Sequence, residues 1–349
     1  MKYLLCVLLL CPALSMAASS QDSPVNITVL DNGLTVLVQP TSSSQSVAIY
    51  ALVKTGSSIE NGCIGCGLSH YVERMLFKGT QRRKVGDIPK EVKSLGGVIN
   101  AQTGFDDTVY TLDLPVGNWK IGMDLIGDML TNAVFDPQEA QRERTVIHGE
   151  MRLYNDQPSR KLSELVFKNV YLYHPYRHPI IGYAPIFDAV NREQLFAYFK
   201  ERYAPNNIIL SVSGAVDPKE VVALAKNIYK NFKPQPLVDH NLPVEPEVIY
   251  PRRHIEEYPT NLYHFSYSFH GVRLLDKDLY ALDLLANVLG GGESALLYQE
   301  IYQKNRLVED VSASNFTPLD KGIFEIEFQM SKDNLEIVLD QINAVINRH

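Results

Sequence analysis

The same order of predicted strands and helices occurs twice in this sequence, and this recurrence constrains the fold more than any other feature. Each unit runs strand, helix, helix, strand, strand, helix, as assigned from apolar periodicity and from glycines at helix ends. The first unit comprises a strand over 46–56, helices over 68–77 and 88–97, strands over 97–103 and 108–115, and an amphipathic helix over 116–135.

The second unit follows about 210 residues later. A repeat of this length indicates duplication of one domain, and the alternative is a chance recurrence of common elements. The second unit comprises a strand over 262–271, helices over 276–291 and 294–304, strands near 308–316 and 322–330, and a helix over 333–346.

The chain between and after the repeats suggests where the domains divide. Residues 137–232 add helices and one strand, and the proline-rich stretch 233–254 is typical of an interdomain linker. We therefore expect a first domain at 24–232 and a second at 255–349. No counterpart of 137–232 follows the second unit before His349, so we expect the second domain to be truncated.

The first residues have the layout of a secretory signal peptide, which we place at 1–18. One lysine precedes an apolar run from Tyr3 to Leu14, and small residues follow. The run is too short to span a bilayer comfortably, and Leu10 stands before Cys11 where a lipoprotein signal needs a small residue. We expect a secreted, periplasmic protein without a membrane anchor.

The charge balance argues against nucleic acid as a partner. Lys and Arg total 33 against 40 Asp and Glu, which gives a net charge of -7. No long basic run is present that could follow a phosphate backbone.

Two cysteines remain once the signal segment is removed. Cys63 and Cys66 form a CxxC motif in NGCIGCGLSH. In an oxidising compartment we expect a local disulfide that stiffens the approach to the next helix. The alternative is a metal role beside His70, although CxxC alone offers only two of the four ligands of a structural zinc site.

The segment that starts this helix carries candidate chemistry. On a helix His70, Glu73 and Arg74 share one face, because residues three and four apart are neighbours. An H-x-x-E-H run would there supply two imidazoles for zinc and a glutamate to polarise a bound water. This chain has H-x-x-E-R instead.

The segment resembles the signature of the M16 family of zinc peptidases, the inverzincins that include pitrilysin and the mitochondrial processing peptidase. The resemblance continues in GGVINAQTGFDDTVY, ERTVIHGEMRLYNDQPSR, YAPNNIILSVSGAVDP and LLANVLGGGESALLYQEI. It implies an α+β fold of two duplicated domains. Each would be a mainly antiparallel sheet covered by helices, and the two would face each other like a clamshell.

The resemblance also implies roles for individual residues. His70 matches the first zinc ligand, Glu73 the general base and Glu150 the third ligand. Glu143 matches the outer acid that supports the site. Asn100 and Ala101 match an edge strand of the family. Family members bind an extended peptide there as a further strand.

Arg74 stands where the family has its second zinc ligand. A guanidinium has no lone pair free for a metal and stays protonated in proteins. At about 4 Å it would also repel a dication by several kcal/mol at intermediate dielectric. We expect Arg74 to pair with Glu73 or Glu150, which would otherwise be buried carboxylates without a partner.

Two further positions depart from the family pattern. The arginine and tyrosine that grip the substrate carbonyl in family members are replaced by Leu296 and Glu309. These losses and Arg74 point the same way, so we expect a catalytically inactive homologue with no cofactor.

The leading hypothesis is a non-catalytic subunit or peptide-binding partner of an active M16 zinc peptidase in the periplasm. Its expected partners are a homologous M16 subunit and an extended peptide. One alternative is an active zinc metalloendopeptidase that completes its site with His70, Glu150 and either Cys66 or water. Another is a free-standing periplasmic peptide-binding protein.

Overall fold

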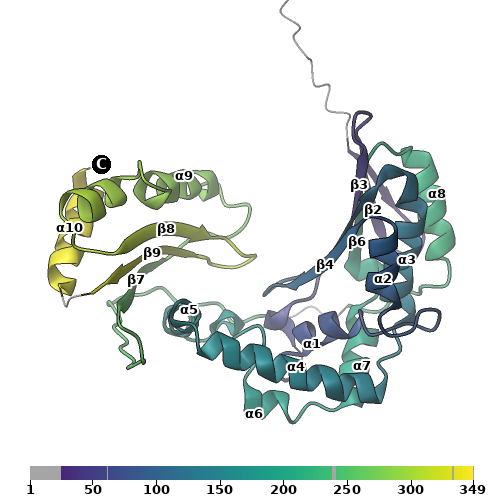
Figure 1. Cartoon of the computed structure of the whole chain (residues 1–349), viewed down its shortest axis with the longest axis horizontal. Coiled ribbons are helices and arrows are strands. Elements are labelled where there is room, and N and C mark those ends of the chain that lie inside the picture. Colours follow the sequence, from purple (N-terminus) through teal and green to yellow (C-terminus); the bar gives the residue numbers. More distant parts are fainter. Residues whose placement is uncertain (1–24, 61, 238–240, 332–333, 349) are drawn as a thin grey trace, which may run out of the picture.

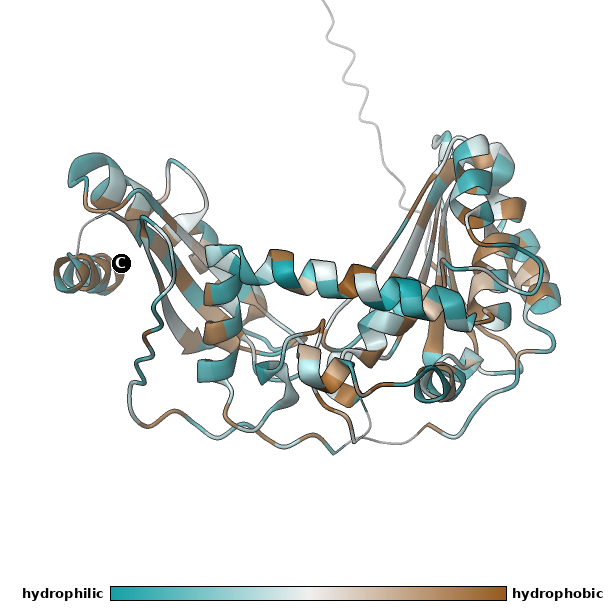
Figure 2. Cartoon of the chain, turned by 60° about the horizontal axis from the view of Figure 1, so that its bottom comes forward, coloured by the Kyte–Doolittle hydropathy of each residue, from teal (hydrophilic) through white to brown (hydrophobic). Residues whose placement is uncertain are grey.

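The computed structural model describes residues 25–60, 62–237, 241–331 and 334–348. They form two lobes, each with one sheet, and the helices that cover each sheet lie on the outside of the molecule (Figure 1). In the turned view of Figure 2 the two sheets face each other, and their strands are rich in hydrophobic residues. The α+β fold of two facing domains is therefore confirmed. The predicted signal segment, 1–18, lies outside the described residues.

Six strands form the sheet of the first lobe: β1 (Asn26–Val29), β2 (Thr35–Pro40), β3 (Ser46–Val53), β4 (Val98–Thr103), β5 (Thr108–Pro115) and β6 (Ile208–Gly214). Their spatial order is β1-β2-β6-β3-β5-β4, and every pair is antiparallel except β2 with β6. Burial alternates along β3, β5 and β6, so one face of the sheet is directed into a core. The strand β4 lies at the edge of the sheet.

Eight α-helices accompany this sheet in the described residues: α1 (Leu68–Met75), α2 (Asp87–Ser94), α3 (Trp119–Asn132), α4 (Pro137–Asn155), α5 (Pro158–Val170), α6 (Ala184–Phe187), α7 (Arg192–Arg202) and α8 (Pro218–Ile228). Capping residues start several of them. The Asp136 carboxylate accepts from two amides of α4, and Asn191 and Gln194 form a capping box on α7. In Figure 1, α2, α3 and α8 cover the outer face of the sheet.

The second lobe repeats the first in a shorter form. It contains β7 (Tyr263–His270), α9 (Leu279–Gly290), a π-helical segment (Tyr298–Lys304), β8 (Asp310–Phe316), β9 (Ile323–Met330) and α10 (Leu335–Arg348). The antiparallel order β7-β9-β8 matches the order β3-β5-β4 of the first lobe. The predicted repeat is therefore confirmed in element order and in strand pairing.

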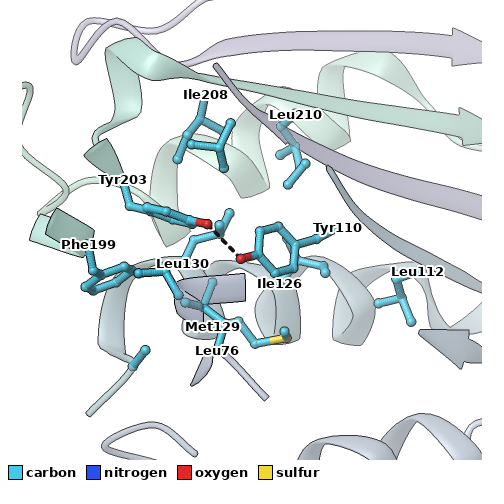
Figure 3. Packing of buried hydrophobic residues seen from close by; sticks show 14 of the residues in the cluster. Leu76, Tyr110, Leu112, Ile126, Met129, Leu130, Phe199, Tyr203, Ile208 and Leu210 are labelled. Atoms are coloured by element: carbon cyan, nitrogen blue, oxygen red, sulfur yellow. Dashed lines mark hydrogen bonds between the residues drawn. The ribbon is translucent and has the colours of Figure 1, made fainter. Parts of the chain in front are cut away.

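The core of the first lobe lies between its sheet and the helices. Figure 3 shows side chains from β5, β6, α3 and α7 meeting there, among them Tyr110, Ile126, Phe199 and Ile208. The hydroxyls of Tyr110 and Tyr203 are 2.8 Å apart, so both buried phenols have a hydrogen-bond partner. This core supports the ends of α1 and β4, which carry the candidate site.

The lobes are joined through an aromatic cluster and a shared carboxylate. Phe105 and Phe167 of the first lobe pack on Phe316 of the second at centroid distances of 5.9 and 5.4 Å. Asp106 accepts from the Tyr176 hydroxyl at 2.6 Å and from the Leu319 amide at 2.9 Å. The turn after β4 is thus fixed to the β8–β9 connection.

The segment predicted as a linker also contacts the first lobe. Described residues of 233–254 contain no helix or strand. Glu245 is buried there and accepts three amide hydrogens, from Leu172, Tyr173 and His174. No helix in the described part of the chain is both long and apolar enough to cross a membrane.

Candidate functional site

Two helices bring the predicted site residues together. His70, Glu73 and Arg74 lie on α1, and Glu143 and Glu150 lie on α4. The helices pack against each other, and the Tyr71 hydroxyl donates to the Ala140 carbonyl between them. The His70 Nε2 atom is 3.6 Å from Glu150 Oε2.

Arg74, which the resemblance aligns with the second zinc ligand of the family, binds two carboxylates. Its Nε donates to Glu143 Oε1 at 2.7 Å, and its Nη2 lies 3.3 Å from Glu150 Oε1. Of the two partners expected from the sequence, Glu73 or Glu150, Arg74 contacts Glu150. Its other partner is Glu143, whose side chain is only 1% exposed and whose other oxygen lies 2.5 Å from Lys78 Nζ.

Glu73 is hydrogen-bonded to the edge strand. It is buried, and its Oε2 accepts from the Thr103 hydroxyl at 2.6 Å, at the end of β4. Burial raises the pKa of Glu73, against the opposing effects of the Thr103 hydrogen bond and of Arg74. The general-base position is therefore tied to the edge strand rather than to the guanidinium.

His70 is held in its neutral form. Burial lowers its pKa to about 4, the positive charge of Arg74 adds to this effect, and Glu143 opposes it. Its Nδ1 is buried and makes no hydrogen bond within the described residues. The imidazole therefore contributes no charge to the cluster at neutral pH.

These residues do not fit a zinc ion. Three protein ligands are usual in catalytic zinc sites, and here a guanidinium takes the place of one and binds the carboxylate that would supply another. Across the described ranges, no group of three or more His, Cys, Asp or Glu side chains is arranged to hold a metal. The charges of Arg74 and Lys78 balance the buried acids instead.

A buried carboxylate that sequence reasoning missed fixes the start of α1. Glu60 accepts from the Ser69 amide at 2.8 Å and from the Gly67 amide at 3.0 Å. Gly67 has a left-handed φ of 72° and lies against the Ile181 carbonyl, where a Cβ would come within 2.3 Å of the oxygen. Glycine at this position lets α1 begin in close contact with the chain that follows α5.

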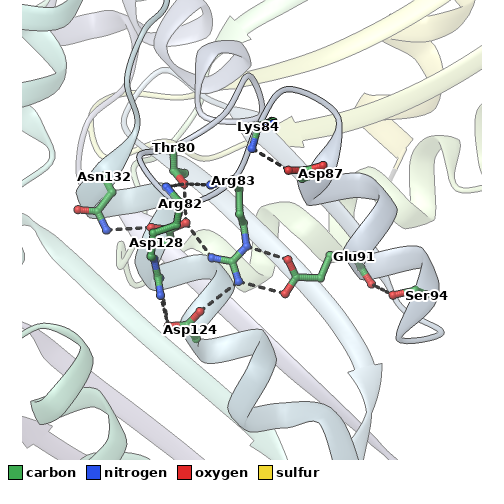
Figure 4. Close-up of polar contacts among 10 residues, drawn as sticks. All are labelled: Thr80, Arg82, Arg83, Lys84, Asp87, Glu91, Ser94, Asp124, Asp128 and Asn132. Carbon is green, nitrogen blue, oxygen red and sulfur yellow. Dashed lines mark hydrogen bonds and ion pairs between the residues drawn. The ribbon is translucent and has the colours of Figure 1, made fainter.

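The chain after α1 is fixed by a network of ion pairs (Figure 4). Arg82 and Arg83 converge on Asp128, whose side chain is fully buried, at 2.8 and 2.7 Å. Arg83 also binds Glu91 of α2 with two nitrogens, and the Thr80 hydroxyl donates to Asp128 at 2.6 Å. Both ends of α1 are therefore anchored.

Cys63 and Cys66 are free thiols in the structure, not the disulfide expected from the sequence. The Cys66 thiol is buried and donates to Glu60 Oε2 at 3.6 Å, so it already has a polar partner. Burial and the nearby Glu60 carboxylate raise the pKa of Cys66. Among the described residues, neither thiol belongs to a group of three or more side chains that could hold a metal ion.

The edge strand expected to bind peptide is present. Asn100 is exposed on β4, and the Ala101 amide donates to the Asn100 side-chain oxygen at 2.9 Å rather than to β5. Since β4 pairs only with β5 among the described strands, its outer edge is open to a further strand. Beyond β4, Phe105, Met151, Tyr154 and Phe167 line part of a cavity of about 340 Å³.

The two departures in the second lobe lie in different surroundings. Leu296 is partly buried and packs on the second hydrophobic core. Glu309 is exposed, and its backbone amide donates to the Gln329 carbonyl at 2.7 Å.

Comparison with known proteins agrees with this architecture. The chain matches the family model "Insulinase (Peptidase family M16)" over residues 35–183 and "Peptidase M16 inactive domain" over 189–349. The border between the matches falls within the first lobe, because β6 and α8 belong to its fold but lie in the second match.

A sequence relative and two solved structures are similar over most of the chain. An "uncharacterized zinc protease" of Rickettsia felis is 30% identical over 332 residues, which cover 93% of this chain and 77% of the relative. The crystal structure of a protease from Helicobacter pylori has a TM-score of 0.86 and 27% identity, covering 94% of this chain and 80% of that one. A Pseudomonas fluorescens structure, a peptidase M16 inactive domain, shares the fold with a TM-score of 0.84 at 22% identity, covering 93% and 79%. The chain belongs to the M16 peptidase family.

Proposed function

We propose that this M16 family member does not cleave peptides itself and acts as a non-catalytic, peptide-binding partner of an active M16 zinc peptidase in the periplasm. The observation that carries the proposal is the position of Arg74. Its guanidinium binds Glu143 and Glu150 at the place where a zinc peptidase needs a ligand. A fixed cation there opposes a dication and also removes the need for one, because it neutralises the same carboxylates.

The edge of β4 supports the peptide-binding part of the proposal. An extended peptide that pairs with β4 gains main-chain hydrogen bonds, and neighbouring pockets select its side chains. The Ala101 amide points to the open edge, and the cavity beside Phe105 and Met151 is mostly apolar in its lining. Neither feature depends on a metal.

Three measurements on the mature protein test the proposal. Metal analysis should find far less than one zinc per chain, and the chain alone should not cleave extended peptides. Added to an active M16 peptidase with which it co-purifies, it should change the rate of cleavage. Near-stoichiometric zinc that is lost in His70→Ala and Glu150→Ala would overturn the proposal in favour of an active enzyme.

Peptide binding has its own test. Ala101→Pro removes one outward amide of β4 but no bond to β5, so the sheet should persist while affinity for an extended peptide falls. Gln102→Pro is the matched control for folding, because the alternation of the strand turns its amide toward β5 and the change should destabilise the sheet. Unchanged peptide affinity in a folded Ala101→Pro variant would contradict strand addition at this edge.

A further inference from the structure

A pair of thiols lies beneath the start of α1, apart from the cluster around Arg74. Cys63 and Cys66 are the first and fourth residues of a turn, in which the Cys66 amide donates to the Cys63 carbonyl at 3.0 Å. The Cα atoms at the ends of such a turn lie within about 7 Å, close to the separation that a disulfide spans. The two thiols are near enough to influence each other, since Cys63 adds to the effects that raise the pKa of Cys66, of which burial is the largest.

The two thiols differ in accessibility. Cys63 is partly exposed, whereas Cys66 is completely buried. The backbone next to Cys66 is tightly packed, since a Cβ on Gly182 would lie 2.7 Å from the Cys66 carbonyl carbon. A molecule arriving from solvent therefore meets Cys63 first, with Cys66 behind it.

Glu60 stands where it can take a proton from the buried thiol. The Cys66 Sγ donates to Glu60 Oε2 at 3.6 Å, and no part of the Glu60 side chain is exposed. Burial raises the pKa of this carboxyl to about 7, against the lowering effect of its bonds to Ser69, Leu68 and Gly67. A base with a pKa near the ambient pH is suited to proton transfer.

We propose that Cys63, Cys66 and Glu60 form a thiol–disulfide exchange site, whose substrate is the disulfide of a low-molecular-weight thiol or of another protein. The Cys63 thiolate attacks one sulfur of R–S–S–R, which forms Cys63–S–S–R and releases RS⁻; the proton that Cys63 gave up converts it to RSH. Cys66 then gives its proton to Glu60 and attacks Cys63 Sγ. The second RS⁻ leaves and takes the proton from Glu60, so two thiols are oxidised and one disulfide is reduced to two RSH.

The chemistry has a structural consequence for α1. In the dithiol form the Cys66 thiol donates to Glu60 alongside the amides of Gly67 and Ser69. Oxidation removes the thiol donor and leaves the backbone donors. The carboxylate that anchors α1 thus reports the redox state of the pair.

The test uses the full-length protein in glutathione buffers of graded ratio, with acid quenching, alkylation and mass spectrometry of the peptide that carries both cysteines. The wild-type protein should convert to the internal disulfide without accumulating a glutathione adduct. Cys66→Ser should stay trapped as an adduct on Cys63, and Cys63→Ser should leave Cys66 unmodified. Replacing glutathione disulfide with an oxidised protein disulfide shows which source the site accepts.

Glu60→Gln tests the proton acceptor and should slow resolution of the adduct by at least about tenfold. If that variant does not fold, the two cysteine variants still decide. The proposal is overturned if Cys66 in Cys63→Ser reacts as fast as Cys63 in Cys66→Ser. It is also overturned if the wild-type pair stays reduced at every ratio or accumulates only adducts.

Discussion

Replacement of Arg74 by histidine gives the most direct measure of what the guanidinium does. The change removes the 2.7 Å bond to Glu143, which is buried, and the 3.3 Å contact with Glu150. Hydrogen bonds to charged groups contribute about 1.5–3 kcal/mol each. Lys78 remains on Glu143, so we expect the metal-free variant to lose about 2 kcal/mol of unfolding free energy.

Zinc should then restore what the substitution removes. The new imidazole, His70 and Glu150 provide three ligands, the usual number in catalytic zinc sites. A ligand present at 100 times its Kd stabilises the folded state by about 2.7 kcal/mol, enough to offset the loss. In a lobe of this size each kcal/mol shifts Tm by about 2–4 °C.

The assay is thermal unfolding of both proteins with zinc and with a chelator. Arg74→His should show a rise in Tm of about 5–10 °C on adding zinc, and the wild-type protein should show none. The control is the double variant His70→Ala with Arg74→His, which should lose the response. An equal rise in the wild-type protein, or no rise in Arg74→His, would refute the reasoning that Arg74 alone separates this site from a metal site.

Three further predictions concern the anchors of α1. Burial acts to raise the pKa of Asp128, but hydrogen bonds from Thr80, Asn132 and two arginines outweigh it and lower the pKa. The ionised carboxylate therefore stabilises the folded protein above about pH 4, and this stabilisation is lost as the pH falls through the lowered pKa. Asp128→Asn should lower the free energy of unfolding by about 3–5 kcal/mol at pH 7. In denaturant titrations at a series of pH values, the variant should lose less stability than the wild-type protein as the pH falls below about 4. Burial raises the pKa of Glu60 from 4.5 to about 7, so stability should fall by up to about 3 kcal/mol as pH rises through that window; an unchanged slope in Glu60→Gln would contradict this. Gly67→Ala should lower the free energy of unfolding by more than about 3 kcal/mol, and its control Gly62→Ala by about 1–2 kcal/mol. Both glycines have positive φ, but only at Gly67 would the added Cβ meet a backbone oxygen. Equal losses in the two variants would exclude the steric argument.

Much of the fold was predictable because local sequence patterns mark its strands and helices, and because the same order of elements occurs twice. The alternation in 108–115 gave the bounds of β5 directly, and the repeated element order predicted the second lobe. The strands β1 and β2 were missed, although Asn32-Gly33 between them is a typical hairpin signal. The parallel pairing of β2 with β6 joins distant parts of the chain, and periodicity carries no information about such a partner.

The candidate site was predictable only where it follows a motif. His70, Arg74, Glu143 and Glu150 converge as the resemblance implied. The hydrogen bond between Glu73 and Thr103 depends on how β4 meets α1, which no local pattern determines.

Glu60 shows a further limit of sequence reasoning. Helix starts are usually recognised from Ser, Thr, Asp or Asn at the cap, but here the cap residue is Gly67. The acceptor comes from a carboxylate seven residues earlier. A cap supplied from outside the helix leaves no signature next to the helix.

Asp106 links the edge strand proposed to bind peptide to the second lobe. Asp106 follows the edge strand by three residues, yet it also holds the Leu319 amide of the other lobe. Away from this junction the lobes diverge (Figure 1). If a peptide pairs with β4 as we propose, it lies three residues from a carboxylate that joins the two lobes, and its binding should then be coupled to their relative orientation.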